Sequence, residues 1–184
     1  MAERNMTVHT PHQVIEGSAT TIGYSEVSEV VVFKHHHSEA HTGDVADDLP
    51  DNVVIKIYHP ANDCIDDEKP ALEALAPLEG QEIPTVYGEV AVEERRALAL
   101  EHIHGVTLAK RMSDFLRKRM LGVLDEDEKH WLCSLDAEIR DLLNKPSQYG
   151  HVVHGDGELR NIMVEERDGK SRLRLMDFSH AQVW

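Results

Sequence analysis

The segment 151–181 constrains the fold more than any other part of this chain of 184 residues. Its Asp168-Gly169 pair is a strong signal for a tight turn, and the apolar stretches on either side have the pattern of two paired strands. A hairpin brings its open ends together, so Asn161, before the first strand, and Asp177, after the second, should lie side by side. Asp156, in the loop before the hairpin, should lie within reach of both.

Two carboxylates and one amide oxygen at the end of a hairpin form a set of hard oxygen ligands, which suits Mg²⁺. This ion keeps several of its waters and prefers to share its protein ligands with phosphate groups. The arrangement expected of this segment therefore indicates phosphoryl transfer.

The rest of the chain predicts an α+β fold in two lobes. β-branched residues are frequent in the first third, which indicates strands, and a polar, histidine-rich stretch over 34–52 indicates a solvated loop. Apolar residues in the middle recur at helical spacing; Thr107 suits an N-cap, and Pro146 is expected to close the last helix. The expected strands are 26–34, 52–58, 84–90, 97–102, 161–164 and 172–176, and the expected helices are 66–78, 108–120 and about 127–145.

The composition excludes several classes of partner. Asp and Glu number 34 against 19 Lys and Arg, which gives a formal net charge of −15. A surface this acidic repels phosphate backbones and anionic lipids, so we expect neither nucleic-acid nor membrane binding. No apolar run is long enough for a transmembrane helix, and the first residues lack the apolar stretch of a signal peptide. With only two cysteines, Cys64 and Cys133, a reduced cytoplasmic or nuclear setting is expected.

The pattern HGD-x-x-x-x-N, followed by a hairpin and Asp-Phe-Ser, resembles the catalytic core of the protein-kinase-like superfamily. The His-Gly-Asp form is similar to that of the aminoglycoside and choline phosphotransferase branch. Upstream, VVIKIY and ALALEHIHGVTL resemble the family's lysine-bearing strand and its hinge. The resemblance implies a nucleotide-binding lobe of five strands and one helix over 1–103. It also implies a reduced helical lobe over 104–184 that carries the catalytic loop and the metal-binding hairpin.

The resemblance assigns a role to each residue of the expected site. Asp156 would act as the catalytic base or orient the acceptor hydroxyl. Asn161 and Asp177 would hold Mg²⁺, and Lys56 would contact the phosphates of ATP.

Further positions carry over to the nucleotide site. Glu68 would pair with the lysine of the strand, with Glu73 as the alternative. The backbone from Glu101 to Ile103 would meet adenine, and Gly23 lies in the loop that would cover the phosphates.

The function implied is an ATP- and Mg²⁺-dependent phosphotransferase that acts on a hydroxyl of a protein or a small molecule. The alternative is a pseudokinase, a nucleotide-binding or scaffold module that acts through protein partners. The loop around Gly23 is poor in glycine, and Glu158 stands where protein kinases often have a lysine. The chain also ends at Trp184, shortly after Asp177, so a truncated family member is expected, with a protein partner covering the apolar face of the hairpin.

Overall fold

The computed structural model describes residues 3–35, 49–61, 64–167 and 169–184. The chain forms two compact units. We call residues 1–66 with 85–102 the barrel unit and residues 67–84 with 103–184 the helical unit. Most of the histidine-rich loop expected over 34–52, and Asp168 of the expected turn, lie outside the described residues. No helix among the described residues is long and apolar enough to cross a membrane.

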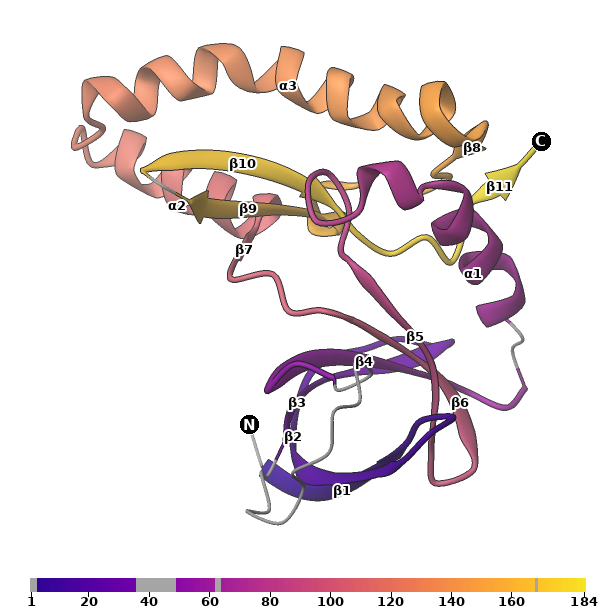
Figure 1. Ribbon diagram of the computed structural model, residues 1–184. Helices are drawn as coiled ribbons and strands as arrows, with labels where there is room; N and C mark the ends of the chain where they lie inside the picture. The colour runs from indigo at the N-terminus through magenta and orange to yellow at the C-terminus, as the bar shows by residue number, and fades with distance from the viewer. Residues whose placement is uncertain (1–2, 36–48, 62–63, 168) are drawn as a thin grey trace. The chain divides into compact units, whose positions relative to one another are not determined.

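The barrel unit is a closed barrel of six strands in the order β1-β2-β3-β4-β6-β5 (Figure 1). Five strands were expected, so the predicted count is wrong. Neither β1 nor β2 is among the strand segments expected from the sequence; β1 pairs along its whole length with β2 and at His9 with Ala91 of β5. The strands are β1 (Glu3–His9), β2 (Val14–Tyr24), β3 (Ser28–His35), β4 (Asn52–Tyr58), β5 (Val86–Val92) and β6 (Arg95–Glu101).

The barrel is filled by one face of each strand. In β4, Val53, Ile55 and Ile57 belong to the buried apolar cluster inside the barrel. Because successive side chains of a strand point to opposite faces, Lys56 and Tyr58 project from the outer face of β4. This alternation decides which residues of the barrel can take part in a site on its outer face.

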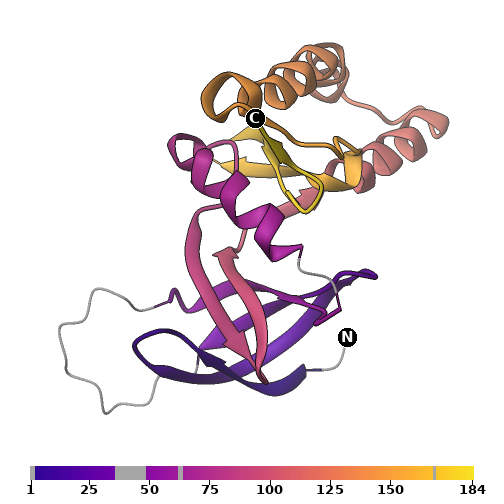
Figure 2. The same ribbon diagram turned by 90° about the vertical axis from the view of Figure 1, so that its right-hand side faces the viewer.

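The helical unit combines helices with two small sheets. Their strand orders are β10-β9-β7 and β11-β8, and α3 runs along the β9–β10 hairpin (Figure 1 and Figure 2). All of helix α1 except its first two residues belongs to this unit. The elements are α1 (Ile65–Ala74), η1 (Ala76–Leu78), β7 (Gly105–Thr107), α2 (Leu108–Met120), α3 (Glu126–Gly150), β8 (Val152–Val153), η2 (Leu159–Asn161), β9 (Ile162–Arg167), β10 (Lys170–Leu175) and β11 (Gln182–Val183).

The two long helices each begin at a capping residue, and the sequence predicts that of α2. The hydroxyl of Thr107 accepts a hydrogen bond from the backbone of Lys110, which confirms the N-cap of α2. Asp125 and Glu128 form a capping box at the start of α3. The prediction that Pro146 closes α3 is wrong. The helix continues to Gly150 because a proline removes only one backbone donor, and Pro146 is itself buried.

The apolar side chains of the β9–β10 hairpin are covered by the chain itself only in part, since Met163 and Leu173 are half-buried. Ile162 and Leu175 are both fully buried, and β7 pairs with β9 on the side away from β10. Burial of these two side chains therefore needs no partner, so the expected partner over the hairpin loses this support and stays a prediction. Gly169, in the turn between the strands, has a φ of 72°, as a tight turn requires.

Candidate active site

The loop from His154 to Asn161 connects β8 to the hairpin and passes close to the segment after it. Gly155 has a φ of 79°, and a Cβ atom at this position would lie 2.1 Å from the carbonyl oxygen of His180. A residue with a side chain would face both a strained backbone and a clash. Glycine at this position therefore allows the loop to lie against the segment that follows the hairpin.

His154 fixes the start of the loop. Its Nδ1 accepts a hydrogen bond from the backbone of Asp156 at 3.3 Å, so its Nε2 carries the proton and donates to the carbonyl of Met176 at 2.9 Å. Burial lowers the pKa of His154, and the hydrogen bond to Met176 and the charges of Asp177 and Asp156 offset this only in part. The imidazole also meets Phe178 edge-on, with ring centroids 4.6 Å apart. A neutral imidazole thus ties the loop to the end of the hairpin.

Asn161 holds the side chain of Asp156. The amide nitrogen of Asn161 donates to the main-chain oxygen of Asp156 at 3.0 Å and to its Oδ2 at 2.9 Å. Both hydrogens of the amide nitrogen are therefore engaged with Asp156. The amide oxygen of Asn161 remains as the atom that could bind a cation.

Asp177 lies close to Asn161 because the preceding residue, Met176, is hydrogen-bonded to Asn161. The N–H of Met176 donates to the carbonyl of Asn161 at 2.8 Å, which aligns the two ends of the hairpin. Asp177 has a φ of 61°, and the hydroxyl of Ser179 donates to its Oδ1 at 2.8 Å. The backbone of Asp177 thus adopts a conformation that few non-glycine residues adopt, and its carboxylate is held by Ser179.

Arg160 forms an ion pair with Asp156 that the sequence did not predict. Its Nη2 lies 3.0 Å from Oδ2 of Asp156, and its Nη1 pairs with Glu158. The spacing of four residues in a loop gave no sign of this contact, because no helical periodicity fixes side-chain directions there.

The two candidate partners of the strand lysine occupy different environments. Glu68 of α1 is 1% exposed, and its Oε1 accepts a hydrogen bond from the backbone N–H of Phe178 at 3.2 Å. Glu73, one turn and a half further along the helix, is exposed to solvent. Lys56, on the outer face of β4, is also buried, and its Nζ lies 5.6 Å from the ring centroid of Tyr58. The ion pair of Lys56 with a glutamate would join residues of the two units and stays a prediction.

Gly23, expected in a loop that covers the phosphates, lies instead in strand β2, next to an irregularity in the pairing of β2 with β3. The turn between these two strands is closed by a serine. The hydroxyl of Ser25 accepts hydrogen bonds from the backbone of Val27 at 3.3 Å and of Ser28 at 3.1 Å. The φ of Gly23 is not positive, and a Cβ atom added there would contact only the side chain of Val30, at 3.6 Å. The turn is therefore organised by Ser25, a residue that the sequence did not single out, and not by the flexibility of Gly23.

Glu101 and Ile103, the two residues that bound the expected hinge, belong to different units. The carboxylate of Glu101 accepts hydrogen bonds from the backbone and the hydroxyl of Thr85, at 2.9 and 3.1 Å. Ile103 is 6% exposed and belongs to the helical unit. Glu101 thus holds the residue before β5 with its side chain and also with its backbone N–H, which donates to the carbonyl of Thr85 at 2.9 Å.

A metal ion would find oxygen donors at the end of the hairpin. In the described part of the chain, no three His, Cys, Asp or Glu side chains converge as in a site built from protein ligands alone. Mg²⁺ does not require such a site, because it uses one or two carboxylates together with phosphates and water. The amide oxygen of Asn161 and the carboxylate of Asp177 fit that pattern.

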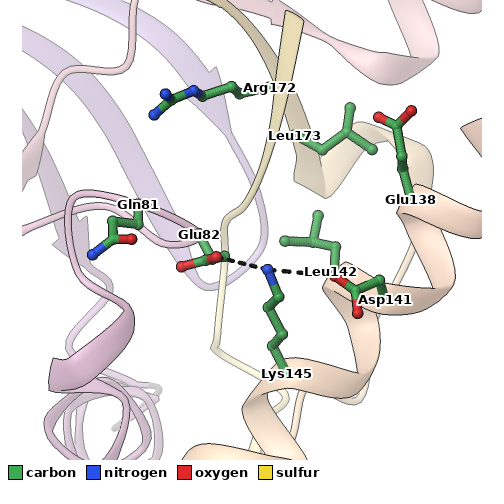
Figure 3. Close-up of a pocket in the computed structure, with 8 residues that line it drawn as sticks. All are labelled: Gln81, Glu82, Glu138, Asp141, Leu142, Lys145, Arg172 and Leu173. Carbon is green, nitrogen blue, oxygen red and sulfur yellow. Dashed lines mark hydrogen bonds and ion pairs between the residues drawn. The ribbon is translucent and has the colours of Figure 1, made fainter. Parts of the chain in front are cut away.

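A groove of about 400 Å³ lies elsewhere in the helical unit (Figure 3). Lys145 of α3 pairs there with Glu82, with Nζ and Oε1 2.7 Å apart, and with Asp141 at 3.4 Å. Hydrogen bonding to Glu82 raises the pKa of Lys145 despite the opposing effect of burial. This pair joins α3 to the segment after η1. The groove is lined by Gln81, Glu82, Glu138, Asp141, Leu142, Lys145, Arg172 and Leu173, none of which is a predicted site residue.

Comparison with known proteins identifies the fold. No family model matches the sequence, and no curated protein matches it. The structure is similar to the kinase domain of PknI from Mycobacterium tuberculosis, with 20% identity, a TM-score of 0.55, and coverage of 89% of this chain and 60% of that domain. A cysteine-to-alanine mutant of the same domain matches with 20% identity, a TM-score of 0.56, and coverage of 88% and 58%. The chain thus spans less than two thirds of the domains it matches, and it has the fold of a protein kinase domain.

Proposed function

We propose that this chain is an ATP- and Mg²⁺-dependent phosphotransferase that acts on a hydroxyl of a protein or a small molecule. The network that joins His154, Asp156, Asn161 and Met176 carries this proposal. It holds one oxygen of the Asp156 carboxylate and places an amide oxygen and the carboxylate of Asp177 at the same end of the hairpin. A loose phosphoryl transition state needs mainly such positioning and charge neutralisation.

Each residue would have a defined task. Asp156 would orient the acceptor hydroxyl and take its proton. Asn161 and Asp177 would hold Mg²⁺, whose charge would offset that of the phosphates, and Lys56 would hold the phosphates from the barrel unit. The backbone between Glu101 and Ile103 would hold adenine. The His-Gly-Asp form and the serine after Asp-Phe support a place near the aminoglycoside and choline phosphotransferase branch.

One observation favours a second function, a pseudokinase that binds partners. The backbone amides of Val27 and Ser28 already have an acceptor in Ser25, so the β2–β3 turn offers fewer donors to a phosphate than an open loop would. Such a module would bind nucleotide weakly or not at all.

Calorimetric titration with ATP, with and without Mg²⁺, separates the two functions. A phosphotransferase should bind ATP in a Mg²⁺-dependent manner, and Asp177→Ala should remove the dependence on Mg²⁺. Asp136→Ala is the matched control, because Asp136 lies exposed on α3 and pairs only with Arg140 among the described residues. A folded wild-type chain that binds no ATP would contradict the enzyme and favour the module.

A further inference from the structure

The carboxylate of Asp156 is held on one side only. Its Oδ2 accepts from Arg160 at 3.0 Å and from Asn161 at 2.9 Å, whereas its Oδ1 accepts no hydrogen bond from the residues that the structure describes. The side chain is 18% exposed, and Oδ1 is not among the buried polar atoms that lack a hydrogen-bond partner, so it has access to solvent. A carboxylate held in this way presents one oxygen to an incoming hydroxyl.

The guanidinium of Arg160 is also held by the carboxylate of Glu158. Its side chain is 61% exposed, and a side chain this exposed loses rotamer entropy when it is fixed in one position. Glu158 pairs with Nη1 while Asp156 pairs with Nη2, so the guanidinium bridges two carboxylates. A planar guanidinium can make two such contacts at once, which the point charge of a lysine cannot match.

The charge of Arg160 also matters for the reaction. Arg160 is the only lysine or arginine in 154–161, a segment that contains two carboxylates. A transferred phosphoryl group is anionic, and uncompensated carboxylates beside it would repel it. Arg160 therefore lowers the net negative charge where the phosphoryl group would pass.

We propose that Arg160 is a positioning residue, which holds Asp156 so that Oδ1 faces the acceptor hydroxyl. This inference rests on the proposed function. In the transfer, the hydroxyl oxygen forms the new bond to phosphorus and the hydroxyl proton passes to Oδ1 of Asp156. The bond from phosphorus to the departing nucleotide breaks, and its electron pair leaves with the nucleotide. Arg160 takes no part in bond formation and acts through Asp156.

The test compares Arg160→Ala and Arg160→Lys with the wild-type chain. The readouts are Mg²⁺-dependent ATP binding by calorimetry and the steady-state formation of ADP, with water as the acceptor hydroxyl. Arg160→Ala should lower kcat by about 10- to 100-fold, the cost of a misplaced catalytic group, and should leave ATP affinity within about twofold. Arg160→Lys should recover only part of the rate. Arg140→Ala, an exposed arginine of α3 that also pairs with an aspartate four residues away, is the matched control and should retain the wild-type rate.

Guanidinium added at millimolar concentration separates a positioning role from a structural one. It should restore part of the rate of Arg160→Ala and leave the wild-type and Arg140→Ala rates unchanged, because only the first variant has an open place beside Asp156. Wild-type kcat in Arg160→Ala, or a loss of rate that guanidinium does not restore, would overturn the inference alone. A wild-type chain that binds no ATP or forms no ADP would overturn the proposed function, and the inference with it.

Discussion

Glu68 and Phe178 are 110 residues apart in the sequence, yet the carboxylate of Glu68 accepts the backbone N–H of Phe178 at 3.2 Å. The contact joins α1 to the segment directly after Asp177. Both groups are buried, so water does not replace the hydrogen bond if one partner is removed. This contact explains why a glutamate lies on the inner face of α1, independently of any pairing with Lys56.

Removing this carboxylate should destabilise the helical unit. Glu68→Ala leaves the N–H of Phe178 buried without its acceptor, which costs about 1–3 kcal/mol of unfolding free energy. Urea unfolding measured by circular dichroism gives this difference. Glu73→Ala is the control, since Glu73 is exposed on the same helix, and it should change the stability by less than about 0.5 kcal/mol. Equal effects of the two substitutions would contradict the role assigned to Glu68.

The stability of the chain should fall as the pH is lowered below about 6.5, the ordinary pKa of histidine. Burial lowers the pKa of His154 in the folded state, so the unfolded chain binds a proton at a higher pH than the folded chain does. The contribution of the neutral imidazole is therefore complete above the unfolded pKa and is lost as the pH falls through the folded pKa.

Unfolding free energies of the wild-type chain and His154→Gln at pH 7.5 and 5.5 measure this contribution. The drop in stability between the two pH values should be smaller in the variant. His9→Gln, at an exposed position of β1, should retain the wild-type drop. If His154→Gln shows the full drop, another group is responsible.

Gly155→Ala should lower the free energy of unfolding more than the same substitution at another glycine with positive φ. Gly155 and Gly122 have φ values of 79° and 70°, but only at Gly155 would a Cβ meet other atoms. Gly122→Ala should cost about 1 kcal/mol, the penalty of the positive φ alone. Gly155→Ala should cost about 1–3 kcal/mol more, because the loop must also move away from His180. Thermal unfolding of the two variants gives the comparison, and equal melting temperatures would contradict it.

The turn between β5 and β6 should be improved by glycine. Glu93 and Glu94 both have positive φ, 48° and 65°, in a hairpin turn that favours asparagine and glycine. Glu94→Gly removes the strain at one position and keeps the pair of Glu93 with Arg95, so it should stabilise the chain by about 1 kcal/mol. Glu26→Gly, in a turn where φ is not positive, should bring no gain. A melting temperature of Glu94→Gly below that of the wild-type chain would show that the turn is not strained.

Local patterns allowed several parts of the fold to be predicted from the sequence. The bounds of β4 and α2 are those expected, because dense β-branched residues and a capped apolar period are local signals. Strands β1 and β2 were missed. Only Met6 and Val8 of the seven residues of β1 are buried, so its pattern alone is too weak, and much of β2 was interpreted as a loop that covers the phosphates. Strand β1 forms because it pairs with β2 and β5. The predicted end of α3 was wrong because the packing around the buried Pro146 outweighs the loss of one backbone hydrogen bond.

The same division holds for the candidate site. The sequence by itself determined which groups can take part, because the order Asp156, Asn161, hairpin, Asp177 follows from short-range spacing and from the way a hairpin joins its ends. Only the tertiary structure decided how these groups are held. The bridge of Arg160 between two carboxylates and the closed turn at Ser25 are local contacts that depend on side-chain directions, whereas the buried carboxylate of Glu68 depends on a contact across 110 residues. None of these is fixed by spacing along the chain, since they follow from which surfaces the folded chain brings into contact.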